Sequence, residues 1–377
     1  MKNIPIIKPF FNKKEETSVC RVLRSGWVTQ GTKVAEFEKR FCEFIDAKYA
    51  IAVSSCTTAL HLALIVNQID RDDEVILPSL TFIATANVVL YCGAKPVFVD
   101  IDWRTFNIDS DKIENSISPN TKAIIVVHQM GLPADMDRIY KIAEKHKLKV
   151  IEDAACAIGS KYKGRFIGAD STLACFSFHP RKLLTMGEGG MITTNNKKYE
   201  KYIRLLRHQG MSVSDIKRHS SNKVIFEKYN IVGYNYRLTD LQAAIGIEQL
   251  NKLQEIIEKR IRLAQRYNEK FKNKDYLITP FVPEYAYTNY QSYCVYIKSK
   301  KNKTRNGLMN YLMSKHISTR RGIMCIHREK PYIEISKNCN LKNSEYASDN
   351  SIILPLYHQM KKEEQDYIIR SIEEYFE

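Results

Sequence analysis

The chain has 377 residues, of which 44% are hydrophobic and 27% charged, and this ordinary composition excludes disordered and fibrous proteins. Because a single core stops growing at roughly 250–300 residues, we expect one large domain and a smaller second one. The formal net charge of +16 would suit a polyanion, but basic and acidic residues are mixed along the chain, and we predict no nucleic-acid partner.

The sequence has no pattern of secretion, membrane insertion or metal binding. Its first apolar stretch is short and interrupted by Pro5, Lys8 and Pro9, unlike a secretion signal. No apolar run approaches the roughly 20 residues of a membrane helix, so we expect a cytoplasmic protein with no membrane partner. The nine cysteines, from Cys20 to Cys339, include no CxxC pair, which favours reduced thiols over disulfides or a metal site.

From about residue 14 to 210, apolar segments of strand length alternate with helical stretches. In chain order these are YAIAV, TTALHLALIV, EVILP, TANVVLY, KPVFVD, KAIIVV, MDRIYKIAEKH and LKVIED. Such alternation indicates a parallel sheet with crossover helices. A helix over 33–44 would direct toward the core four side chains spaced three and four residues apart, namely Val34, Phe37, Phe41 and Phe44. The sequence therefore predicts a layered α/β domain.

Beyond residue 210 the pattern changes. Residues 211–230 are largely polar and without periodicity, so we predict a long loop, either functional or a tolerated surface insertion. A continuous helical pattern over about 239–271 is expected to link the two domains. The rest, from about 275 to 377, has the strand-like segment SYCVYI and helical stretches near 304–315 and 361–376, which is typical of a small α+β domain.

Two charged residues suggest a specific chemistry. Asp153 ends the buried strand of LKVIED, at the edge where open α/β sheets gather ligands. Lys182 lies in FSFHPRKLLTMGEGG, where a Pro180 turn presents it. Alone, such a lysine is usually a solvated surface residue and such an aspartate a cap. Together they suit pyridoxal phosphate, because a lysine forms a Schiff base with its carbonyl and an aspartate keeps its pyridine nitrogen protonated.

The segment AVSSCTTALHLALIV offers a site for the phosphate of that cofactor. A strand, a turn of small polar residues and a helix beginning near Thr57 follow one another, and helix N-termini bind phosphate well. Thr57 and Thr58 add hydroxyl groups, and Ser177 could add another donor. The alternative for this segment is an ordinary capped helix. Phe82, just past a strand end, could stack on a flat cofactor or pack in the core.

Ordered motifs run along nearly the whole chain, namely SGWVTQG (25–31), VSSCTTALHLAL, LPSLTFIATANVVLYCGAKPVFVDID, VHQMGLPADMD (127–137), VIEDAACAIGS, FSFHPRKLLTMGEGGM, GYNYRLTDLQAAIG (233–246) and TRRGIMCIHREKPY (319–332). Together they resemble the DegT/DnrJ/EryC1/StrS aminotransferases, which use pyridoxal 5'-phosphate and act on nucleotide-linked keto sugars. The resemblance implies an aspartate aminotransferase-like fold of type I. Its large α/β domain, with a mainly parallel sheet between helices, would span 13–247, and its small α+β domain 248–377 together with 1–12.

The resemblance also assigns roles around the cofactor ring. It implies that Lys182 carries the cofactor as a Schiff base, that Asp153 pairs with the pyridine nitrogen and that Phe82 stacks against the ring. Cys156 stands where many members have His or Gln, so it also belongs to the implied cofactor pocket. A freed Lys182 amine would move the proton during catalysis, and burial with neighbouring cations would favour its neutral form.

At the phosphate, the resemblance implies contacts from Thr57, Thr58 and Ser177. Asn235 would reach the phosphate from the neighbouring subunit, which makes the expected active unit a homodimer with shared sites. Cys56 stands where many members have Gly in the phosphate turn.

The segment HPRKLLTMGEGG looks like that of members that aminate sugar C4, rather than the YPxKNLGALGDGG of C3 enzymes. The resemblance therefore implies a nucleoside-diphosphate 4-keto-6-deoxy sugar, with glutamate as the donor, 2-oxoglutarate as the by-product and pyridoxamine 5'-phosphate as the intermediate cofactor form. A subset of the family that removes a hydroxyl group has His in place of the lysine, and Lys182 argues against that activity.

By family position, the expected substrate contacts are Trp27, Thr29, His327 and, from a partner subunit, Arg237. The guanidinium of Arg237 suits a diphosphate or a donor carboxylate. The alternatives are interdomain packing for Trp27 and a structural ion pair for Arg237.

Three other functions stay open at this point. The substrate could be a C3-keto sugar or a keto-cyclitol, which direct assay of candidate ketones would separate from the C4-keto sugar. A basic nucleic-acid-binding regulator lacks a recognition helix and a concentrated basic stripe. A non-catalytic protein that retains the fold is disfavoured by the intact pair Lys182 and Asp153.

Overall fold

The computed structural model describes residues 3–213, 218, 221–299, 302–337 and 339–377. A seven-stranded sheet in the order β1-β9-β8-β5-β4-β2-β3 forms its centre. The strands are β1 (Tyr49–Val53), β2 (Glu74–Pro78), β3 (Lys95–Val99), β4 (Thr121–Val127), β5 (Lys149–Asp153), β8 (Ala174–Ser177) and β9 (Gly190–Thr194). From β3 to β8 neighbouring strands are parallel, whereas β9 is antiparallel to both β8 and β1. The predicted, mainly parallel sheet is confirmed.

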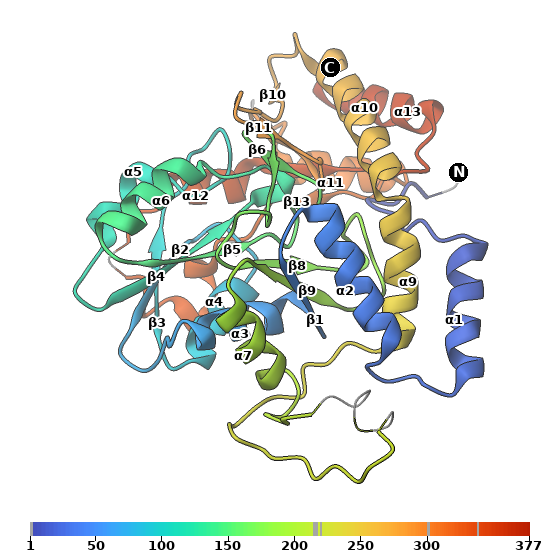
Figure 1. Cartoon of the computed structure of the whole chain (residues 1–377). Helices are drawn as coiled ribbons and strands as arrows, with labels where there is room; N and C mark the ends of the chain where they lie inside the picture. Colours follow the sequence, from blue (N-terminus) through green and yellow to red (C-terminus); the bar gives the residue numbers. More distant parts are fainter. Residues whose placement is uncertain (1–2, 214–217, 219–220, 300–301, 338) are drawn as a thin grey trace.

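Helices cover both faces of this sheet (Figure 1). On one face α3 (Cys56–Val66), α4 (Ala84–Tyr91) and α7 (Lys197–Leu206) bury side chains such as Ile51, Leu77 and Ile151. The other face packs against α2 (Thr32–Ile45), α6 (Met136–Lys145) and α9 (Asp240–Asn251). Successive strand residues point to opposite faces, so a strand buried on both sides is apolar throughout.

The helix predicted over 33–44 is confirmed as α2. Val34, Phe37 and Phe41 are buried in the core between α2 and the sheet. Phe44 is half-buried, and its ring centroid lies 5.4 Å from that of Phe166. Two further helices are α1 (Lys13–Ser25), which precedes α2, and the short α5 (Ser110–Ile113), which lies between β3 and β4.

A smaller antiparallel sheet in the order β10-β12-β14-β13 occupies the C-terminal part of the chain. Its strands are β10 (Leu277–Ile278), β12 (Tyr293–Ile297), β14 (Ser351–Leu354) and β13 (Arg320–Arg321), and its helices are α11 (Arg305–Ser314), α12 (Lys342–Asn350) and α13 (Lys362–Phe376). The helices predicted near 304–315 and 361–376 are therefore confirmed. Ile4 packs in the same core as this sheet. Three short strands, β11 (Ala286–Tyr287), β6 (Lys161–Tyr162) and β7 (Arg165–Phe166), connect this part to the chain beyond β5.

The single helix predicted over 239–271 is wrong at one residue. The structure has two helices, α9 and α10 (Leu253–Phe271), which are separated at Lys252, where φ is −112° and ψ is 4°. Lys252 forms an ion pair with Glu15, and its Nζ lies 4.4 Å from the centre of the Phe10 ring. These partners come from the N-terminal segment, so the helical pattern of residues 239–271 contains no sign of them.

The loop predicted over 211–230 has closely spaced ends. Met211 and Tyr229 form an isolated antiparallel bridge, and Ser212 N donates to Lys228 O at 2.9 Å. Residues 214–217 and 219–220 of the predicted loop lie outside the described residues. Among the helices that the structure describes, none has both the length and the apolarity needed to span a bilayer.

Asp240 holds the start of α2 from a position about 200 residues further along the chain. Its Oδ1 accepts hydrogen bonds from Gly31 N at 2.8 Å and Val34 N at 2.9 Å, and its Oδ2 accepts one from Lys33 N at 3.1 Å. A Cβ at Gly31 would lie 2.2 Å from Trp27 Nε1 and 2.6 Å from Asp240 Oδ2, so only glycine fits there. The carboxylate therefore satisfies N–H groups that have no partner within α2.

We expect Asp240→Ala to lower the free energy of unfolding by about 2–3 kcal/mol, because a buried charged acceptor of several N–H groups is lost. Urea unfolding followed by circular dichroism measures this. The matched control is Asn196→Ala, which removes an exposed cap that accepts from Lys198 N at 2.8 Å within its own helix. The control should cost only about 1 kcal/mol. Equal losses in the two variants would contradict a special role for Asp240.

Candidate active site

Lys182 follows β8 in an irregular turn at the carboxyl edge of the parallel strands. Its backbone N donates to His179 O at 2.8 Å, and its Nζ lies 3.0 Å from Cys156 Sγ. Burial lowers the pKa of Lys182, but the acidic groups of Cys156, Cys56 and Asp153 raise the pKa by more, so it lies above the ordinary lysine value. This direction is opposite to the expectation of a neutral amine, because the neighbours are acidic groups rather than cations.

Asp153 is the last residue of β5 and is buried. Its Oδ2 accepts from Thr85 Oγ1 at 2.9 Å and its Oδ1 from Ala155 N at 3.1 Å. Burial raises the pKa of this carboxyl group, and neither the two hydrogen bonds nor the charge of Lys182 cancels that effect. A cationic group facing Asp153 would therefore stabilise its ionised form. A protonated pyridine nitrogen is a cation of this kind, so the residue fits the predicted cofactor.

The predicted phosphate site lies at the N-terminus of α3. Ser55 caps this helix, since its Oγ accepts from Thr58 N at 3.1 Å. The Thr58 hydroxyl donates to Ser55 O at 2.8 Å and accepts from Ser55 N at 3.1 Å, so it is engaged in the cap. The backbone N–H groups of Cys56 and Thr57 lead the helix and have no acceptor within it. Thr57 is half-buried, and its hydroxyl makes no hydrogen bond to another described residue.

Ser177 and Gly190 bring β8 and β9 against this helix start. The two residues pair across the strands, and Ser177 Oγ accepts from His179 N at 3.4 Å. A Cβ at Gly190 would lie 2.4 Å from the carbonyl carbon of Ser55, so glycine lets the strand approach the first turn of α3. Cys56 Sγ donates to Cys175 O at 3.5 Å, which ties α3 to β8 as well. The structure thus brings the α3 terminus, Ser177 and the Lys182 turn together.

Phe82 and Asn235 are exposed, whereas Arg237 is half-buried. Phe82 follows β2 and is 65% exposed. Asn235 is exposed and pairs with His208 in an isolated bridge, while Arg237 Nη1 lies 3.0 Å from His208 Nδ1. The predicted contacts of Phe82 with the ring, and of Asn235 and Arg237 with a partner's site, stay predictions.

Trp27 and Thr29 lie in the loop that Asp240 anchors. Trp27 is half-buried, and its Nε1 donates to Gln30 O at 3.3 Å. The side chain of Thr29 is exposed, whereas its backbone O accepts from Asp240 N at 2.9 Å. The loop is therefore held by its backbone, and its predicted substrate contacts stay predictions.

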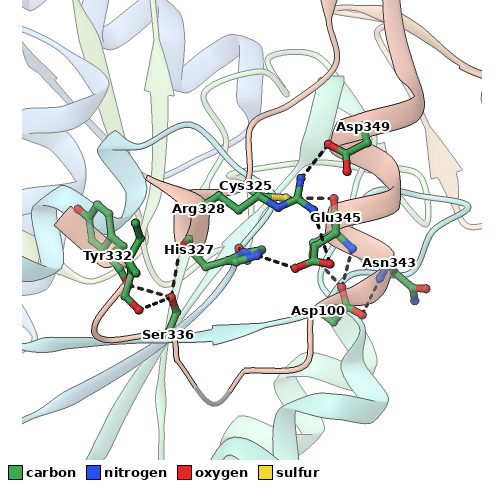
Figure 2. A network of polar contacts seen from close by, with 12 residues as sticks. Asp100, Cys325, His327, Arg328, Tyr332, Ser336, Asn343, Glu345 and Asp349 are labelled. Carbon is green, nitrogen blue, oxygen red and sulfur yellow. Dashed lines mark hydrogen bonds and ion pairs between the residues drawn. The ribbon is translucent and has the colours of Figure 1, made fainter. Parts of the chain in front are cut away.

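His327 joins the large sheet to α12, and Figure 2 shows its contact with Glu345 on that helix. Its Nδ1 lies 2.6 Å from Ser79 Oγ, beyond the end of β2, and its Nε2 lies 3.1 Å from Glu345 Oε1 on α12. Nearby, Asp100 accepts from Ser344 N at 2.7 Å and Asn343 N at 3.1 Å, and so caps the same helix. Both ring nitrogens of His327 have partners within the chain, so a substrate contact would require one of them to be exchanged.

Sequence reasoning missed Thr85 and the buried pair His128 and Glu152. His128 Nδ1 accepts from Ala134 N at 3.1 Å, so Nε2 carries the proton that faces Glu152 Oε2 at 3.0 Å. Burial raises the pKa of Glu152, but His128 and Tyr140 outweigh this effect and lower it overall. This pair fixes the VHQMGLPADMD segment beside Asp153. The available signals were a polar residue at the start of a buried helix and a charged residue inside a buried strand.

Comparisons with known proteins agree with this geometry. The profile of the DegT/DnrJ/EryC1/StrS aminotransferase family matches residues 10–373. The spore coat polysaccharide biosynthesis protein SpsC of Bacillus subtilis is 38% identical over 374 residues, which cover 98% of this chain and 96% of that protein.

Solved structures of two proteins share the fold. PseC of Helicobacter pylori, an aminotransferase involved in the biosynthesis of pseudoaminic acid, has 29% identity and a TM-score of 0.92, with 100% of this chain and 99% of that chain covered. The putative sugar aminotransferase Spr1654 of Streptococcus pneumoniae, in its pyridoxamine phosphate form, has 28% identity and a TM-score of 0.92, with 99% and 98% covered. Spr1654 has also been solved in its pyridoxal phosphate form. The chain belongs to the DegT/DnrJ/EryC1/StrS aminotransferase family, whose cofactor is pyridoxal 5'-phosphate.

Proposed function

We propose that this protein transfers an amino group from glutamate to the C4 keto group of a nucleoside-diphosphate 4-keto-6-deoxy sugar, in the cytoplasm, for glycan biosynthesis. The observation that carries the proposal is the meeting of Lys182, Cys156 and Asp153 beside the start of α3. The names of PseC and SpsC, which refer to pseudoaminic acid and a spore coat polysaccharide, support a sugar as the substrate. The segment around Lys182 supports C4.

The residues divide the work of such a site. Bound pyridoxal phosphate supplies an electron-accepting ring and a carbonyl that exchanges amino groups. Lys182 would hold it covalently through Nζ and, once displaced, would carry a proton to and from the substrate carbon. Asp153, oriented by Thr85, would face the ring nitrogen. The N–H groups of Cys56 and Thr57 at the start of α3 would bind the phosphate.

The first experiment is the visible absorption spectrum of the purified protein before and after glutamate is added. We expect a yellow band in the wild type that disappears with glutamate, as 2-oxoglutarate forms. In Lys182→Ala the band of the covalently held cofactor should be absent, because no amine is left at that position. Borohydride reduction and peptide mass spectrometry should place the cofactor on Lys182. A wild type that gains no band even with added pyridoxal phosphate would refute the proposed function.

A panel of ketones separates the possible substrates. The protein is first converted to the form that carries the aminated cofactor. We then expect nucleoside-diphosphate 4-keto-6-deoxy sugars to restore the yellow band at least about tenfold faster than 3-keto sugars or keto-cyclitols. The reason is that a keto group at another position is not correctly oriented for reaction. Stopped-flow absorbance compares the rates at one fixed ketone concentration of about 0.1 mM. Faster reaction of a 3-keto sugar or a keto-cyclitol would replace the C4 assignment with that alternative.

We further propose a homodimer in which Asn235 completes the partner's site. The support is the exposure of Asn235 and of two apolar residues that precede it in the chain, because Phe226 and Val232 are each 87% exposed. Exposed apolar surface of this kind is typical of interfaces. Arg237 lies two residues beyond Asn235 and would approach the same neighbouring site.

Mixing two inactive variants tests the shared site. Lys182→Ala and Asn235→Ala should each be nearly inactive alone. When they are unfolded and refolded together, half of the dimers should be mixed, each with one intact site, so activity should recover to about a quarter of wild type. Activity no higher than the sum of the two separate variants, despite mixed dimers seen by native mass spectrometry, would contradict the shared site.

A further inference from the structure

A buried segment, residues 288–292, lies between the two loops that carry Lys182 and Cys156 and the C-terminal part of the chain. It precedes β12, and its residues alternate in direction. Thr288, Tyr290 and Ser292 line a pocket together with Gln129 and Met130. Asn289 and Gln291 point the other way, toward the loops of the candidate active site. We propose that Asn289 and Gln291 are positioning residues that set the place of Lys182, an inference that rests on the proposed function.

Asn289 holds the loop that follows Asp153. It is fully buried, and its Nδ2 donates to Cys156 O at 2.9 Å and to Ile158 O at 2.8 Å. Its backbone N donates to Ser160 Oγ at 3.2 Å. At Gly131, where φ is +89°, a Cβ would lie 1.8 Å from Asn289 Oδ1, so glycine makes room for the amide. One side chain thus fixes the backbone of Cys156, the residue whose sulfur contacts Lys182.

Gln291 holds the other side of that contact. Its Nε2 donates to Arg181 O at 2.9 Å, and this carbonyl belongs to the peptide unit that joins Arg181 to Lys182. Its own orientation is fixed, because its N donates to Asn289 Oδ1 at 2.8 Å and its Oε1 accepts from Ser292 Oγ at 3.0 Å. Since a peptide unit is planar, a bond to its carbonyl oxygen also restrains the positions of Lys182 N and Cα, the backbone atoms from which its side chain extends.

Arg260 on α10 binds the backbone of the segment 288–292. Its Nε donates to Tyr290 O at 2.9 Å, its Nη2 to Gln291 O at 2.6 Å and its Nη1 to Leu356 O at 2.7 Å. Burial lowers the pKa of Arg260 to about 9. No carboxylate among the described residues forms an ion pair with it, so the three carbonyl oxygens provide its compensation. The two amides therefore connect a rigid helix to both residues of the contact between Lys182 and Cys156.

The consequence for the chemistry is geometric. The distance of 3.0 Å between Lys182 Nζ and Cys156 Sγ depends on two backbone positions, and each is held by one of these amides. A misplacement of about 1 Å can cost on the order of a hundredfold in rate when reacting groups must be aligned. If the amides served only to stabilise the fold, their loss would lower stability and leave the reactivity of Lys182 unchanged.

The test compares Gln291→Met with the matched control Gln365→Met in the full-length protein. Gln365 is also buried, and its Nε2 also donates to a backbone carbonyl, Leu263 O at 2.8 Å. It is a residue of α13 and lies away from Lys182. Cofactor-free protein is mixed with pyridoxal phosphate, and the rate at which the yellow band grows is measured from about pH 6 to about pH 10. This range extends from near neutral pH to the ordinary pKa of a lysine side chain. Urea unfolding of each variant is measured in parallel.

We expect Gln291→Met to slow attachment of the cofactor by about tenfold or more and to shift its pH profile, while Gln365→Met keeps the wild-type rate and profile despite a similar loss of stability. A wild-type rate and profile in a folded Gln291→Met protein would overturn the inference. If Gln291→Met does not fold, Gln291→Glu, which keeps the size and the acceptor for Ser292, is measured under the same criterion. Absence of the band in the wild type would instead refute the proposed function.

Discussion

The parallel pairing of β5 with β8 is the constraint on which the candidate active site depends. It sets Asp153 opposite Cys175, two residues before β8 ends and the chain turns toward Lys182. A carboxylate and an amine that are distant in the sequence therefore meet at one edge of the sheet, where the carboxyl ends of the strands leave room for a ligand. The close packing of β9 on the start of α3, which Gly190 permits, adds a helix N-terminus to the same edge.

Within the protein alone, neighbouring groups do not fully compensate the burial of the Asp153 carboxylate at this edge of the sheet. Burial raises the pKa of Asp153, so ionisation of this carboxyl group costs stability as the pH rises from its ordinary pKa toward its raised one. The acidic neighbours of Lys182, in contrast, favour its charged form and raise its pKa. A ligand with a cationic ring nitrogen, a carbonyl and a phosphate complements Asp153, Lys182 and the α3 terminus in turn. Such a ligand would offset the unfavourable burial of the ionised Asp153 carboxylate.

The rigidity of the site comes from the rest of the chain rather than from the sheet alone. Arg260 holds the segment 288–292 by its carbonyl groups, and that segment holds the loops of Cys156 and Lys182 by two amides. On another side, Asp240 fixes the backbone of the loop 25–31, which carries Trp27 and Thr29. Buried amides and carboxylates that bond to backbone groups are well suited to this purpose. Leaving such a group without a hydrogen-bond partner costs free energy, so other arrangements of the same loops are disfavoured.

The sequence by itself determined the alternation of strands and helices and the helices α2, α11 and α13, because each of these is encoded in local periodicity. It also pointed to Lys182 and Asp153 as candidate residues, since each follows or ends a strand at the same edge of the sheet. It also indicated the α3 terminus, although the Thr58 hydroxyl turned out to be engaged in the cap. Only the tertiary structure decided the break at Lys252, the capping of α2 by Asp240, and the contacts of Thr85, Asn289 and Gln291. Each of these depends on partners far along the chain, and a local pattern carries no information about which distant residue the fold will bring into contact.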